Sequence, residues 1–307
     1  MNRFSLLALV LCFSAFVVSG CASINSASDV GAYQQKASEG DEAALKTLIG
    51  LLKSSDKLVR DAAYKAIISA GKPAVPMLIE MLNDKDPEMQ EYAAGALGNI
   101  GDERAVEPLM TMLEKAQSRR YIAAWALGEM KAAVAIEMLV KTMGEKNEAL
   151  QKESARALMK IGGPSVPALI AALGSSNPDV RKYSARALGI IEDKRGEEPL
   201  IKALGDDRRD VASAAALALG TAGTDKSIQP LIAVLATGDM TTKINASISL
   251  GQLDAKVAVD PLTKIMETDD DPYVRQWCAR ALENITGSRY KYKDEHGAMV
   301  YPYNLYR

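Results

Sequence analysis

The feature that most constrains this chain is a short string that returns about every 31 residues. It is clearest at Ala96-Leu97-Gly98-Asn99-Ile100-Gly101. One apolar residue marks each copy: Ile67, Leu97, Leu127, Leu158, Leu188, Leu219, Leu250 and Leu282. Successive markers lie 30 to 32 residues apart. So regular a period predicts an array in which each unit packs against its neighbours.

Each unit has the pattern of two helices. A proline recurs in a second register, with Glu137 in its place in the fourth unit: Pro76, Pro108, Pro167, Pro199, Pro230 and Pro261. We expect this proline to open the first helix, where its missing N–H does no harm. The pairs Asp86-Pro87, Asn177-Pro178 and Asp271-Pro272 predict the cap and first residue of the second helix. Apolar or small residues at offsets −8, −4, −1, 0 and +3 from the marker share one helix face.

These features resemble the HEAT-like repeats, in particular the short variety known from the phycobilisome-lyase-related family. The matching residues run from Asp86-Pro87 to Ala96-Leu97-Gly98, and again over 177–189 and 271–282. The resemblance implies an all-α fold, an α-solenoid of about eight two-helix repeats whose second helices line the concave surface. It implies little about function, since such repeats serve many roles.

The first 20 residues have the pattern of a signal peptide. Residues 6–18 are apolar except for Ser14, too short a run to span a bilayer but typical of a signal-peptide core. The run ends in Val18-Ser19-Gly20-Cys21, which resembles the bacterial lipoprotein signal. That resemblance implies cleavage before Cys21, acylation of Cys21 and a membrane anchor. An ordinary secretory signal with a chance cysteine is the alternative.

The residue after Cys21 bears on which membrane would hold the anchor. Ala22 stands there rather than Asp, so by the same resemblance the inner-membrane retention signal is missing. We therefore expect a lipid-anchored protein of the cell envelope. In a source with two membranes, the periplasmic face of the outer membrane is favoured.

Composition restricts the chemistry that the chain can perform. The one histidine, His296, lies outside the array, which weighs against histidine catalysis and zinc. A net charge of −2 weighs against a nucleic-acid partner. The run Asp269-Asp270-Asp271 lacks calcium-loop spacing, so we interpret Asp271 as a helix cap and its neighbours as solvated. Cys278, at offset −4, is expected to be a buried core thiol. No catalytic residue, metal ligand or cofactor is predicted.

One stripe of the second helices is the candidate binding surface. Offsets −5, −2 and +2 lie on a face away from the packing face. The candidate protein-binding residues on it are Tyr92, Trp125, Arg156, Tyr183, Arg186, Trp277 and Arg280. These residue types dominate binding hot spots. The alternative is that they seal grooves between adjacent helices.

A second column, at offset −7, is interpreted as structural. It resembles a ladder that pairs with carboxylates or carbonyls of neighbouring loops. Its members are Arg60, Gln90, Arg120, Gln151, Arg181, Lys243 and Arg275.

The expected organisation has four parts. Residues 1–20 form the signal peptide, and residues 21–40 a lipidated tether and N-terminal cap with a helix over 30–38. Residues 41–287 form the array, and residues 288–307 a tyrosine-rich tail. This composition is typical of an extended, hairpin-like segment over the last repeat. A tail that binds a partner is the alternative, and the sequence does not decide between the two.

The functional hypothesis is a non-enzymatic, membrane-anchored scaffold or assembly factor. It would bind a protein or peptide partner in the envelope through its concave face. Two alternatives stay open: an enzyme or small-ligand binder using Trp125, Arg156 and Arg186 around a concave pocket, and a structural spacer. The sequence does not indicate the oligomeric state.

Overall fold

The computed structural model describes residues 30–116 and 118–302. Cys21 and the expected signal peptide lie outside them. The chain divides into two compact units between Met77 and Leu78, inside helix α4 (Val75–Met81). Within the described ranges, no helix has both the length and the apolar character needed to cross a membrane.

Unit 1 is a small three-helix packing. Helices α1 (Val30–Ser38), α2 (Glu42–Leu51) and α3 (Lys57–Ala70) all contact one another. Asp41 caps α2, because its carboxylate accepts hydrogen bonds from the backbone N–H groups of Ala43 and Ala44. The helix expected over 30–38 is confirmed as α1.

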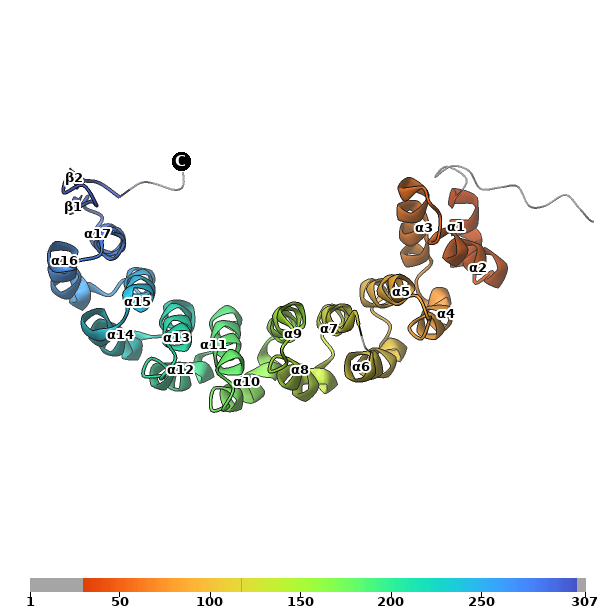
Figure 1. Ribbon diagram of the computed structural model, residues 1–307, viewed down its shortest axis with the longest axis horizontal. Coiled ribbons are helices and arrows are strands. Elements are labelled where there is room, and N and C mark those ends of the chain that lie inside the picture. The colour runs from red at the N-terminus through yellow and green to blue at the C-terminus, as the bar shows by residue number, and fades with distance from the viewer. Residues whose placement is uncertain (1–29, 117, 303–307) are drawn as a thin grey trace, which may run out of the picture. The chain divides into compact units, whose positions relative to one another are not determined.

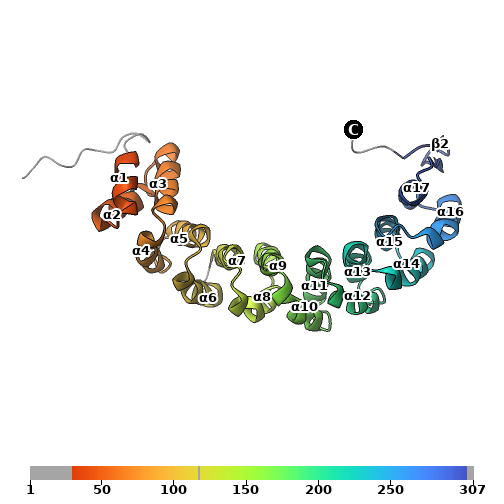
Figure 2. The ribbon, with the colours of Figure 1, turned by 180° about the vertical axis from the view of Figure 1, so that it is seen from behind.

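Unit 2 consists of two layers of helices. The second helices of the repeats are α5 (Pro87–Ile100), α7 (Arg120–Glu129), α9 (Glu148–Ile161), α11 (Pro178–Ile191), α13 (Arg209–Ala222), α15 (Met240–Gln252) and α17 (Pro272–Thr286). The first helices are α6 (Val106–Lys115), α8 (Ile136–Thr142), α10 (Val166–Ala172), α12 (Glu197–Ala203), α14 (Asp225–Thr237) and α16 (Val259–Thr268). Figures 1 and 2 show that in this unit the odd-numbered helices line the concave side of a curved stack, and the even-numbered ones the convex side. The predicted helical-repeat solenoid is thus confirmed.

The helix starts follow the sequence pattern with one correction. Asp86, Asn177 and Asp271 cap the second helices, and each accepts a backbone N–H two residues on. The first helices were expected to open at proline. Instead the α-helix begins one or more residues earlier, and a one-turn 3₁₀ helix precedes most of them. In α14 this turn is absent and Thr224 caps the helix, so Pro230 lies inside it.

The recurring Ala-Leu-Gly string is explained by contacts between neighbouring second helices. The glycine at offset +1 lies against the small residue at offset −1 of the next repeat. A methyl group added at Gly98, Gly128 or Gly189 would lie 2.8, 2.6 or 2.7 Å from the Cα atom of Ala126, Ala157 or Ala218. No side chain fits in such a space, so glycine lets these helices pack backbone to backbone.

The column at offset −7 forms the expected ladder. Arg181 makes a bidentate ion pair with Asp206 at 2.7 and 2.8 Å and also donates to the Ser175 carbonyl. Arg120 pairs in the same way with Glu145 of the next loop. Four further members bind loops as well: Arg60, Gln90, Lys243 and Arg275. Gln151 is the exception, because it is buried on α9 beside Asp179 of α11.

The acidic run at 269–271 corrects one expectation. Asp271 caps α17 as predicted. The neighbours were expected to be solvated, which is wrong for Asp269. Its side chain is only 8% exposed and pairs with Lys243 at 2.7 Å, because the −7 ladder reaches this loop.

The chain after α17 forms the expected hairpin. Strand β1 (Tyr292–Lys293) pairs antiparallel with β2 (Met299–Val300) and lies against α16 and α17. Tyr292 is buried there. Arg275 of α17 fastens the hairpin, because its Nε donates to the Lys293 carbonyl at 2.7 Å.

Candidate functional site

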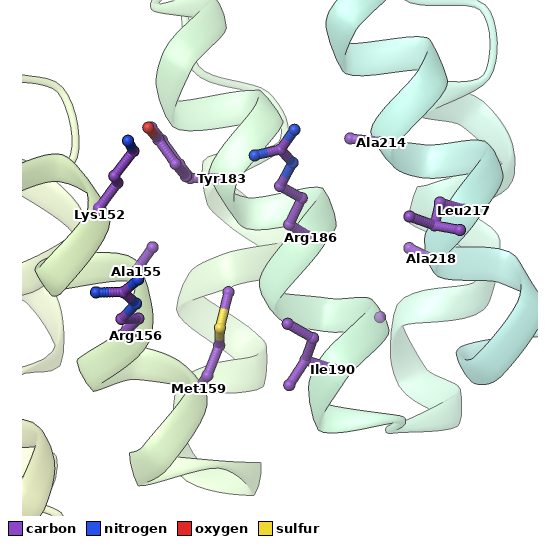
Figure 3. Close-up of a pocket in the computed structure, with 11 residues that line it drawn as sticks. Lys152, Ala155, Arg156, Met159, Tyr183, Arg186, Ile190, Ala214, Leu217 and Ala218 are labelled. Carbon is purple, nitrogen blue, oxygen red and sulfur yellow. The ribbon is translucent and has the colours of Figure 1, made fainter. Parts of the chain in front are cut away.

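A hollow of about 470 Å³ opens on the concave side of unit 2, across α9, α11 and α13. It is lined by Lys152, Ala155, Arg156, Met159, Tyr183, Arg186, Gly189, Ile190, Ala214, Leu217 and Ala218. Figure 3 shows two ends. Lys152, Tyr183 and Arg186 place their polar atoms at one end, and Met159 and Ile190 lie at the other. Leu217 lies level with Arg186 on α13, and Arg156 lies on α9 between the two ends. The hollow therefore has a polar end at Lys152, Tyr183 and Arg186 and an apolar end at Met159 and Ile190.

Met159 explains why the hollow lies between α9 and α11. It stands at offset +1 from its marker. In the other repeats of unit 2, except the last, this position is a glycine: Gly98, Gly128, Gly189, Gly220 and Gly251. The thioether side chain cannot fit where a methyl group already clashes. As a result α9 and α11 pack less closely than α7 with α9 or α11 with α13. The side chain of Met159 thus accounts for the wider separation of α9 and α11.

The three cations of the hollow are unequally compensated. Lys152 pairs with Glu148 at 2.5 Å, and Arg156 pairs with Glu153 on the same helix. Arg186 is exposed and, among residues 30–116 and 118–302, has no carboxylate or other hydrogen-bonding partner. It is therefore the uncompensated cation of the hollow.

Tyr183 forms the wall beside Arg186. The residue is only 7% exposed, and the ammonium group of Lys182 lies 5.1 Å from its ring centre. Burial disfavours the charge of Lys182, but Asp179 and Asp210 outweigh this and keep its pKa above the usual value. The hydroxyl of Tyr183 has no hydrogen-bond partner within the described chain and is not among its fully enclosed polar atoms. It is free to donate to or accept from a ligand.

The other four candidate residues lie outside the hollow. Trp125 is half-buried on α7, and its ring covers Gly98 of the preceding repeat while Lys160 lies 5.9 Å from its centre. Tyr92 is half-buried on α5. Trp277 and Arg280 stack on each other at 4.7 Å on α17. The structure thus brings together Arg156, Tyr183 and Arg186.

Sequence reasoning missed the aliphatic part of this site. Ile190 and Leu217 lie on the predicted stripe, at offsets +2 and −2, but only aromatic residues and arginines were selected there. They are 63% and 43% exposed. The signal that could have located the hollow is Met159 in a glycine column. The predicted packing face comprises offsets −8, −4, −1, 0 and +3, so it gives no weight to the residue at offset +1.

Cys278 and His296 are placed as expected. Cys278 is fully buried, and burial raises the pKa of its thiol to about 11. A thiol that stays protonated in the core is a poor nucleophile. His296 lies in the hairpin loop with its side chain 81% exposed, next to Glu295.

Comparison with sequence families gives matches over most of the array. The model described as HEAT repeats matches residues 45–127, 166–242 and 197–283. The PBS lyase HEAT-like repeat model matches residues 119–143 and 150–175. A search of curated proteins finds no match.

Several solved structures are similar. The Escherichia coli protein YibA is 20% identical, covers 85% of this chain and 97% of its own, and has a TM-score of 0.50. Kap95p bound to RanGDP is 15% identical over 84% of this chain and 43% of its own, with a TM-score of 0.57. The CpcE–CpcF phycocyanin lyase of Nostoc sp. PCC7120 is 24% identical over 48% of this chain and 98% of its own, with a TM-score of 0.46. At these identities the likeness concerns the fold alone.

Proposed function

We propose, since this chain belongs to the HEAT-repeat family, that it is a non-enzymatic scaffold or assembly factor that binds a protein partner through the concave face of unit 2. The observation that carries the proposal is the exposure of Ile190 and Leu217 beside Arg186 on that face. Aliphatic side chains left in water around a hollow are typical of a surface that another molecule covers. Exposed aliphatic groups with a polar rim are the usual composition of a protein interface.

The chemistry of the hollow supports binding rather than catalysis. Its lining consists of three cations, one phenol and aliphatic groups. Histidine and the carboxylates, which enzymes use most often as general acids and bases, are not among these lining residues. These side chains hold a ligand in place. Kap95p, whose fold is similar, binds a protein in its solved complex.

The anchor and the location form the second part of the proposal. Cleavage before Cys21 and acylation of its sulfur and amino group would tether the chain to the envelope. Several acyl chains on one residue hold a protein stably, whereas one chain is marginal. The face of unit 2 would then meet partners near that membrane, the outer one in a cell with two membranes.

The function is tested by capturing partners from detergent-solubilised envelopes with the full chain and mapping crosslinks. We expect crosslinks to concentrate on α9, α11 and α13, and a charge reversal at Arg186 to remove the captured protein. The matched control is a reversal at Lys202, an exposed cation on the convex layer. Crosslinks confined to the convex helices would reject the concave face as the binding surface.

The anchor is tested separately with Cys21→Ser. Because the sulfur that carries the lipid is lost, we expect the variant to take up no labelled palmitate and to leave the membrane fraction. Cys278→Ser is the matched control, since Cys278 lies buried in the array. Palmitate still entering Cys21→Ser would contradict the proposal.

A further inference from the structure

We infer that the hollow between α9, α11 and α13 is a socket for a helical segment of the partner protein that carries a carboxylate one turn away from a large aliphatic side chain. The inference rests on the proposed function and specifies the partner's chemistry. Three observations carry it: the uncompensated cation, the separation of the polar and apolar ends, and the presence of Met159 where other repeats have glycine.

The polar end selects a carboxylate. Arg186 lacks an acidic partner in the described chain, whereas Lys152 and Arg156 have Glu148 and Glu153. A guanidinium group binds a carboxylate through two parallel N–H···O bonds. The free hydroxyl of Tyr183 lies on the same side of the hollow and can donate to the same group (Figure 3). A basic or neutral segment would leave Arg186 without compensation.

The apolar end selects an aliphatic side chain at a defined distance. Ile190 follows Arg186 by four residues on α11, which is about 6 Å along the helix axis. Met159 lies across from Ile190 on α9, and Leu217 adds a further aliphatic side chain from α13 (Figure 3). Residues three or four apart on a partner helix present their side chains with a similar separation of about 5–6 Å. A glutamate or aspartate with leucine, isoleucine or valine one turn away therefore matches both ends.

Because Met159 stands at offset +1 in α9, the socket lies at the interface between α9 and α11. Where glycine stands at offset +1, the following helix approaches to backbone contact. Restoring glycine at residue 159 would let α9 and α11 close in the same way. The substitution therefore removes the cavity without touching any of the charged residues.

The binding test uses the full chain and a labelled, alanine-rich helical peptide of about 18 residues that carries Glu and Leu at positions i and i+4. Fluorescence anisotropy gives its Kd for the wild type and for Arg186→Gln, Met159→Gly and the convex control Lys202→Ala. We expect Arg186→Gln to weaken binding about tenfold, as loss of a charge-assisted hydrogen bond does. Met159→Gly should weaken binding at least as much, and Lys202→Ala should leave it unchanged.

Changes in the peptide complete a double-mutant cycle. Replacing its Glu by Gln should weaken binding to the wild type about tenfold but have little further effect on Arg186→Gln, because both changes remove one contact. Moving Leu to i+2 should also weaken binding, since it then faces away from the hollow.

Four results would overturn the inference. The first is that the Glu–Leu peptide does not bind the wild type at about 1 mM, and the second is that the Gln peptide binds it as tightly as the Glu peptide. The third is that Met159→Gly, shown by circular dichroism to be folded, binds the peptide with the Kd of the wild type. The fourth is that sodium octanoate binds in the hollow as tightly as the peptide does. If any of these is found while captured partners still crosslink to the concave helices, the socket is wrong and the proposed function stands. Crosslinks on the convex layer alone would instead reject the function.

Discussion

Trp125 shows how much a single residue can tell before its neighbours are known. Its offset placed it on the concave stripe, and its residue type suited a binding hot spot. The structure places its ring over Gly98, at the contact between α5 and α7. This position favours the groove-sealing interpretation that the sequence left open.

We therefore expect Trp125→Ala to lower the free energy of unfolding by about 1–3 kcal/mol, because a half-buried aromatic contact is lost. Affinity for the captured partner, measured per folded molecule, should change little. Chemical denaturation and partner titration on one purified variant check both points. Intact stability with binding weakened by about 2 kcal/mol or more would instead make Trp125 a hot spot.

The residues that could be predicted from sequence are those whose role is local or periodic. Asp86 and Asn177 are identified as caps because the proline after each marks the helix start. Leu188 is identified as core because its position repeats, and it is fully buried. Met159 could not be identified by its own chemistry. Its effect depends on the next repeat. Ala187 stands there at offset −1, the position that packs against the glycine at the other interfaces.

Among the elements, the ladder of ion pairs ties each second helix to the following loop. Burial raises the pKa of Asp206, but the hydrogen bonds from Arg181 and from the Arg208 N–H, together with the charge of Arg181, outweigh it and hold the pKa below its usual value. The Arg120 hydrogen bond likewise lowers the pKa of Glu145. These carboxylates bind protons less readily in the folded chain than in the unfolded one. Their contribution is present above pH about 4 and is lost as the pH falls through the folded-state pKa.

Arg181→Ala should therefore cost roughly 1–3 kcal/mol of unfolding free energy near pH 7, since it leaves Asp206 without its partner. The difference from the wild type should shrink as the pH is lowered from about 5 to about 3. Urea denaturation across this range measures it, with Arg209→Ala as the control at an exposed arginine of α13. A difference that stays constant with pH would show that Arg181 acts through packing alone.

At the scale of the molecule, the stability of unit 2 depends on contacts between neighbouring repeats. The interface between α9 and α11 is looser than those on either side of it, because Met159 replaces glycine. The number of repeats and their helices could be predicted from the sequence, whereas the terminal hairpin was one of two expectations for the tail. The uneven strength of the interfaces could not, because the alignment of repeats treats every interface as equivalent.

We expect amide hydrogen exchange to divide unit 2 into two cooperative blocks that meet between α9 and α11. A one-dimensional array separates first at its weakest contact. In Met159→Gly the two blocks should merge and open with one free energy. Exchange followed by mass spectrometry resolves peptides from both helices. A single block in the wild type would show that the looser packing carries no energetic cost.

The hairpin after α17 bears on how copies of this chain associate. Within unit 2, the second helix of each repeat before the last one packs against the repeat that follows it. If the same surface of the last repeat were uncovered, a repeat of another molecule could pack there. Such head-to-tail contacts do not close on themselves and lead to fibres. Glu283 stands at the +1 position of the last repeat and accepts a hydrogen bond from the Tyr290 N–H at 3.2 Å, while β1 covers the adjacent surface. The hairpin thereby covers the surface on which a repeat of another copy would stack, which disfavours head-to-tail association.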